Sequence, residues 1–171
     1  MTGMTVKVEN KHGDIDFRKI AMEEVFKAAV KVRNEWQKNL HKGIGAEGFH
    51  GGEWRDTGES VNDVTISPQR PAMEISVGGD HIGLAIAEYG RRPNAPMPPH
   101  TPIARWSRRQ GLTPYEGQTF ENMVFNIRQS IGEKGIRGFA PARLAAVRVS
   151  RDIDENISQR IDQEVADAGG E

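Results

Sequence analysis

Side chains that could bind a metal ion gather around one glycine-rich stretch, residues 43–58. His41 precedes the stretch, and His50 and Glu53 lie within it, close to Asp56. Imidazole and carboxylate groups are ordinary ligands of zinc and other transition metals. The order His-Gly-Gly-Glu differs, however, from the His-Glu-x-x-His helix, in which one helical face presents both histidines. We therefore expect solvated loop residues and no bound metal, and keep a metal-dependent hydrolase as the third hypothesis for function.

A catalytic nucleophile is equally hard to find. The chain has no cysteine, which excludes thiol catalysis, disulfides and zinc–thiolate sites. No serine stands in a Gly-x-Ser-x-Gly motif, and no GxxxxGK[ST] phosphate loop is present. GIGAEG, from Gly43 to Gly48, matches GxGxxG but does not follow a predicted strand. We expect no catalytic residue and no cofactor, and therefore a protein that is not an enzyme.

A local basic patch is the next candidate for chemistry. Arg105, Arg108 and Arg109 surround Trp106, a combination that could follow nucleic-acid phosphates or meet an acidic partner. The chain as a whole carries a net charge of −1, which gives no general attraction to DNA. No helix-turn-helix or RNA-binding signature is present. A nucleic-acid-binding module is the second hypothesis, without sequence-specific contacts.

A proline-rich segment supplies the candidate interface. Five of the nine prolines lie between Pro93 and Pro102, directly after an apolar stretch. Polyproline-like backbone has already lost much of its freedom, so it can contact a neighbour at low entropic cost. The candidate subunit or partner contacts are Glu88, Tyr89, Arg91, Arg92, Pro96, Pro98 and Pro99.

Glu88 continues an apolar row and needs a partner if it is buried. Arg91 or Arg92 could pair with it within the chain, or a neighbouring subunit could supply the cation.

These residues depend on elements that the hydrophobic pattern predicts. A helix is expected from Asp16 to Leu40, with Asp16 as N-cap and Gly43 at its C-terminal end. Its apolar face repeats at three- and four-residue spacing. The members of that face are Ile20, Ala21, Val25, Ala28, Ala29, Val32, Trp36 and Leu40.

An antiparallel sheet is expected to follow the first helix. Alternating apolar residues predict strands at Val61–Ser67, Ala72–Val77 and Ile82–Tyr89. The last of these leads into the proline segment. The sequence therefore predicts a three-stranded meander.

Helices are predicted in the second half of the chain. A short one covers Ile103 to Gln110. A longer one ends at Lys134 and begins either at Thr113, where Thr113-Pro114-Tyr115-Glu116 has the form of a capping box, or nearer Thr119, because Gly117 weakens the earlier start. The stretch from Gly135 to Val147 fits more than one structure. Ile153, Ile157, Ile161 and Val165 form a narrow stripe in a last amphipathic helix, residues 152–168.

These elements define an α+β fold. We expect an N-terminal arm at 1–15 and one α+β domain at 16–150, with a long N-terminal helix packed on a small antiparallel sheet, further C-terminal helices and extended loops. An amphipathic helix and tail follow at 151–171. No apolar run approaches the ~20 residues that span a bilayer, so no membrane contact is expected.

The order of three short motifs resembles a known family. Asp56-Thr57-Gly58 precedes the predicted sheet, Ala87-Glu88-Tyr89-Gly90 ends its last strand, and a Gly-Ile-x-x-Phe-x-Pro-Ala element spans 135–142. Together they resemble the small neck and tail-completion (head–tail joining) proteins of tailed bacteriophages, over roughly residues 16–147.

The resemblance implies a structural virion protein. Members of that family form rings, usually hexamers, which cap the tail tube and dock the head. The implied partners are other copies of the chain, a tail-tube or tail-completion protein, and a head-completion or connector protein. Genomic DNA would pass through the axial channel without sequence-specific binding. The implied location is the neck or tail top of the virion, after assembly in the host cytoplasm; tail terminator, neck spacer and head-completion plug all stay open.

Overall fold

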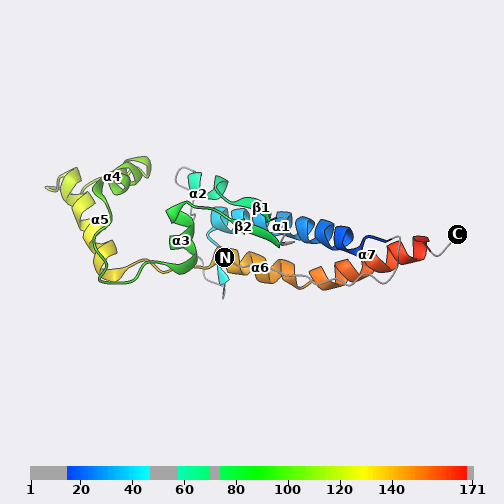
Figure 1. Ribbon diagram of the computed structural model, residues 1–171. Coiled ribbons are helices and arrows are strands. Elements are labelled where there is room, and N and C mark those ends of the chain that lie inside the picture. Colours follow the sequence, from blue (N-terminus) through cyan, green and yellow to red (C-terminus); the bar gives the residue numbers. More distant parts are fainter. Residues whose placement is uncertain (1–14, 47–57, 70–73, 169–171) are drawn as a thin grey trace.

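The computed structural model describes residues 15–46, 58–69 and 74–168 and shows an elongated molecule (Figure 1). The long helix α1 (Phe17–Lys42) runs beside the last two helices, α6 (Pro141–Ser150) and α7 (Ile153–Ala168). We call this part, with the sheet and the short helices that cover α1, the body. A helical hairpin projects from the body at the end away from the C-terminal half of α7.

Helix α1 follows its sequence signals. The Asp16 carboxylate accepts a hydrogen bond of 3.0 Å from the Lys19 N–H, as an N-cap does. Gly43 takes the left-handed conformation, with φ of 60°, and closes the last turn. The predicted apolar face is the buried face, except that Val32 is only partly buried.

The sheet is smaller than the sequence predicts. Strands β1 (Thr65–Gln69) and β2 (Glu74–Gly78) pair antiparallel, with Ile66 opposite Val77. The predicted strand start at Val61 is wrong, because Val61 lies in the single turn α2 (Glu59–Asn62). Val61 and Val64 are buried three residues apart, which suits a turn of helix rather than a strand.

The third predicted strand is also wrong, since Ile82–Tyr89 forms helix α3. His81 caps this helix: its ring Nδ1 accepts from the Gly83 N–H at 3.0 Å. The Asp63 carboxylate accepts from the His81 N–H at 2.7 Å and thereby turns the chain away from the sheet edge. The two residues that α3 buries, Leu84 and Ala87, are three apart, so the apparent alternation also satisfies a helical period.

The helical hairpin consists of α4 (His100–Arg109) and α5 (Phe120–Lys134). Thr119 caps α5 by accepting from the Asn122 N–H at 3.2 Å, so the later of the two predicted starts is confirmed and the capping box at Thr113 is wrong. Residues 97–134, which contain both helices, are called the lobe.

Two apolar clusters fill the body. One joins α1 to α2, α3 and α6 through Trp36, Leu40, Val61, Val64, Leu84, Ala87, Phe139 and Ala145. The other joins α1 to β2 and α7 through Val25, Ala28, Ala29, Ile75, Ile153 and Ile157. Helix α7, expected as a C-terminal segment of its own, is thus packed on α1 by its isoleucine stripe.

The α+β class is therefore confirmed, with a long N-terminal helix, a small antiparallel sheet and helices after it. Within the described ranges, no helix is both long and apolar enough to cross a membrane.

Candidate functional site

The lobe is joined to the body by two chain segments that run antiparallel and in contact, residues 87–91 and 135–142, which we call the connector. Arg91 and Ile136 form an isolated antiparallel bridge, in which each N–H donates to the other residue's carbonyl, at 2.7 and 2.9 Å. Next to it, the Phe139 and Ala140 N–H groups donate to the Ala87 carbonyl, at 2.8 and 3.2 Å. The motif that contains Glu88 and the motif that contains Phe139 are therefore in direct contact.

Glycines allow the connector segments to approach this closely. A Cβ on Gly90, whose φ is 76°, would lie 2.4 Å from the Ile136 carbonyl oxygen. A Cβ on Gly138 would lie 2.4 Å from the Gly90 nitrogen. Neither position can hold a side chain without displacing backbone, so both glycines are needed for the close approach of the two segments.

Glu88 has its partner within the chain, but the partner is a helix end and not an arginine. Its carboxylate accepts from the Ala142 N–H at 2.9 Å and from the Arg143 N–H at 3.2 Å. These are orphan donors in the first turn of α6, whose own N-cap residue, Ala140, makes no side-chain cap. A carboxylate at this position also complements the positive end of the helix dipole.

The proline segment packs against α5 of the lobe and does not extend freely. The Asn94 and Ala95 N–H groups donate to carbonyls at the end of α5, those of Glu133 and Gly132, at 3.2 and 3.1 Å. The Arg128 Nε donates to the Pro98 carbonyl at 2.7 Å. Pro98 is buried, so among the predicted contact prolines only Pro96 and Pro99 are exposed.

The other predicted contact residues differ in exposure. Tyr89 is 80% exposed and borders a groove of about 420 Å³ between the sheet and α3. Arg92 is exposed, whereas Arg91 is half-buried and donates from its guanidinium to the Pro96 carbonyl. Apart from the prolines and the half-buried Glu88 and Arg91, the exposed members of the predicted contact set are therefore Tyr89 and Arg92.

The lobe exposes more apolar surface than its small core explains. Its buried residues are small ones such as Pro98, Ala104, Ser107 and Val124. The large apolar side chains that it exposes are Met97, Trp106, Leu112, Tyr115 and Phe125. A helical hairpin with so little buried area is marginal by itself, because burial of apolar side chains supplies most helix stability. The sequence analysis did not single out these exposed residues, although Tyr115 and Phe125 stood outside every predicted stripe.

The predicted arginine patch is on the lobe. Arg105, Arg108 and Arg109 are all exposed on α4 and share one face by their spacing of three and four residues. The Arg108 guanidinium lies over the Phe120 ring, 4.7 Å from its centroid, which fixes the cation without neutralising it.

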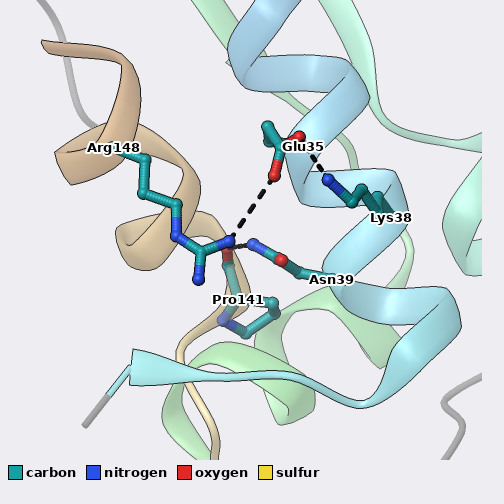
Figure 2. Close-up of polar contacts among 5 residues, drawn as sticks. All are labelled: Glu35, Lys38, Asn39, Pro141 and Arg148. Carbon is teal, nitrogen blue, oxygen red and sulfur yellow. Dashed lines mark hydrogen bonds and ion pairs between the residues drawn. The ribbon is translucent and has the colours of Figure 1, made fainter. Parts of the chain in front are cut away.

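Polar contacts tie α1 to α6 in the body (Figure 2). The buried Asn39 side chain donates to the Pro141 carbonyl at 3.1 Å. Glu35 binds Lys38 at 2.8 Å and Arg148 of α6 at 3.6 Å. The hydrogen bond from Lys38, together with the positive charges of Lys38 and Arg148, holds the pKa of Glu35 below its ordinary value. These contacts fix the helix whose first turn Glu88 caps.

The candidate ligands of the metal hypothesis lie mostly outside the described part of the chain. His50 and Glu53 lie outside the described residues, as does Asp56, and His41 lies near the end of α1. Residues 15–46, 58–69 and 74–168 contain no group of three or more side chains that could hold a metal ion.

Comparison with protein-family models, curated proteins and solved structures finds no match for this chain. Function is therefore argued from the geometry of the connector and the lobe.

Proposed function

We propose that the protein is a structural component of a phage head–tail junction, a subunit that assembles with copies of itself into a ring at the top of the tail. The observation that carries the proposal is the lobe, which exposes Trp106, Tyr115 and Phe125 over a minimal core. Large apolar side chains that stay exposed on a unit with so small a core favour a protein–protein interface there. A subunit of a larger assembly gains the missing burial from its neighbours.

The connector supports the same proposal. Ala87-Glu88-Tyr89-Gly90 and the Gly-Ile-x-x-Phe-x-Pro-Ala element carry the resemblance to head–tail joining proteins, and they lie in contact through backbone hydrogen bonds. Motifs that form one structural unit are better support for kinship than motifs scattered over a surface. The unit holds the lobe away from the body (Figure 1), where a neighbouring subunit can reach it.

The test is the mass of the particles that the purified full-length chain forms, alone and with isolated tail tubes. Native mass spectrometry and electron microscopy are expected to show rings, or binding to the end of the tube. Monomers under both conditions would overturn the proposal.

A pair of variants locates the surface. Tyr115→Ser, at a side chain 86% exposed, is expected to weaken assembly by about tenfold, the effect of a moderate interface contact. Ile82→Ser is the control, because Ile82 is also an exposed apolar residue, at 70%, but belongs to α3 of the body. Equal effects of the two substitutions would remove the lobe from the interface.

A further inference from the structure

The two ends of the molecule carry opposite charge. Helix α4 in the lobe holds three arginines and no acidic residue. Helix α7 holds five acidic residues, Asp154, Glu155, Asp162, Glu164 and Asp167, against the single cation Arg160. Figure 1 places α4 at one end of the molecule and the C-terminal half of α7 at the other. Helices α4 and α7 thus carry opposite charge in a chain whose net charge is only −1.

The acidic residues of α7 include a group that is exposed on one side of the helix. Glu155 and Asp162 are exposed and seven residues apart, so they share one side of α7, with exposed Asp154 beside them. We call these three residues the acidic face. Glu164 lies off this face and is paired with Arg160 at 2.6 Å, so the internal cation does not neutralise the acidic face. Val165, 36% exposed, adds an apolar contact on the same side.

Helix α4 carries a corresponding face of opposite charge. Arg105, Arg108 and Arg109 lie along one face of α4, with Trp106 at its border and 36% exposed. Both surfaces are helix faces that carry three like charges and an apolar side chain. Surfaces of opposite potential steer association and fix its register.

We infer that the arginine face of α4 in one copy docks on the acidic face of α7 in the next copy. The inference rests on the proposed function, to which it adds the pair of surfaces that join neighbouring subunits. The occupant is a second copy of this chain, because the chain itself carries the complementary face. One molecule cannot satisfy the contact internally, since α4 lies in the lobe and α7 runs along the body away from the lobe (Figure 1), so the contact runs head to tail. Duplex DNA is the weaker match for the arginines, because a chain with a net charge of −1 has no general attraction to DNA.

Charge reversal at each face provides the test. In the full-length chain, Arg105→Glu with Arg109→Glu, and separately Glu155→Arg with Asp162→Arg, are each expected to weaken self-association by about 100-fold, because like charges then face each other. An equimolar mixture of the two variants is expected to regain association, because the reversed, acidic α4 of one variant can pair with the reversed, basic α7 of the other. Their unchanged faces can pair in the same way. Lys42→Glu with Lys134→Glu is the control, as both lysines are exposed last residues of helices outside the two faces. It is expected to associate like the wild type.

The outcomes separate this inference from the proposed function. If the wild type assembles, and neither reversal weakens assembly or the mixture fails to recover it, the pairing of α4 with α7 is overturned while the ring remains. If the wild type stays monomeric alone and with tail tubes, the proposed function itself fails. Loss of binding to a labelled DNA duplex by the arginine variant, with assembly unchanged, would assign the arginine face to nucleic acid and overturn the inference.

Discussion

At the scale of single residues, Glu88 stabilises the end of a helix far from it in sequence. Its two hydrogen bonds to the first turn of α6 replace the cap that Ala140 does not provide. We expect Glu88→Gln to lower the free energy of unfolding by about 1–2 kcal/mol, because the charge and one acceptor are lost at a helix N-terminus. Urea unfolding followed by circular dichroism measures this change.

The matched control is Glu116→Gln, at an exposed carboxylate in the turn before α5. Substitutions at exposed positions of this kind usually change the free energy of unfolding by no more than about 0.5 kcal/mol. A Glu88 variant as stable as the control would show that α6 does not need this cap.

Glu35 makes a pH-dependent contribution to the contact between α1 and α6. Its pKa is lower in the folded protein than the ordinary 4.5, mainly through the hydrogen bond from Lys38 and then through the charges of Lys38 and Arg148. Its stabilisation is therefore complete above the unfolded-state pKa and is lost as the pH falls through the lower folded-state pKa.

We expect Glu35→Gln to lower the free energy of unfolding by about 0.5 kcal/mol at neutral pH, the usual contribution of a partly exposed ion pair. The difference from the wild type should narrow in acid and disappear below the folded-state pKa. Urea midpoints measured across the acid range test this, with Glu23→Gln, an exposed carboxylate of α1, as control. A difference that persists unchanged into acid would rule out the ion pair as its cause.

At the scale of elements, local signals were reliable wherever capping residues and a long period agreed. Asp16, Gly43 and the repeated apolar face define α1 in the sequence, and Thr119 marks the start of α5. Over the eight residues of α3, alternation and helical spacing cannot be told apart, and the deciding bond from His81 to Asp63 joins residues 18 apart. The partner of Glu88 lies 54 residues away, beyond the reach of any local pattern. The α+β class and most helices were therefore predictable, whereas the connector and the position of the proline segment were not.

From the geometry of the connector we predict that the body folds without the lobe. Arg91 and Ile136 already face each other as an antiparallel pair, so a two-residue Asn-Gly turn can replace residues 92–135. We expect this lobe-less chain to fold with both body clusters intact, because no member of either cluster is removed. Circular dichroism, cooperative urea unfolding and the dispersion of NMR amide signals measure the result.

The proline segment gives the complementary experiment at this scale. Deletion of Asn94 to Pro99 removes the backbone donors of Asn94 and Ala95 and the acceptor of Arg128, all of which bind α5. We expect that deletion to loosen the lobe and impair assembly while the body stays folded. Protease protection of α5 equal to that of the wild type, or normal incorporation into infectious particles, would contradict this role.

At the scale of the whole molecule, a contact between unlike ends has a consequence that a symmetric contact lacks. Each subunit in a head-to-tail ring uses one lobe and one acidic face, so a subunit without a lobe accepts one neighbour and offers nothing to the next. The lobe-less chain should therefore terminate assembly when it is mixed with wild-type protein. If subunits instead joined through a two-fold contact between their lobes, the lobe-less chain would not bind and would not affect assembly.

We expect native mass spectrometry of such mixtures to show open, truncated oligomers that end in one lobe-less subunit, at ratios well below one lobe-less chain per wild-type chain. The control is the lobe-less chain that also carries Glu155→Arg and Asp162→Arg, which should no longer interfere, since its acidic face is reversed. Interference that survives this reversal would mean that the body binds its neighbour through another surface. Complete rings of wild-type protein beside free lobe-less monomers would mean that subunits join through their lobes alone.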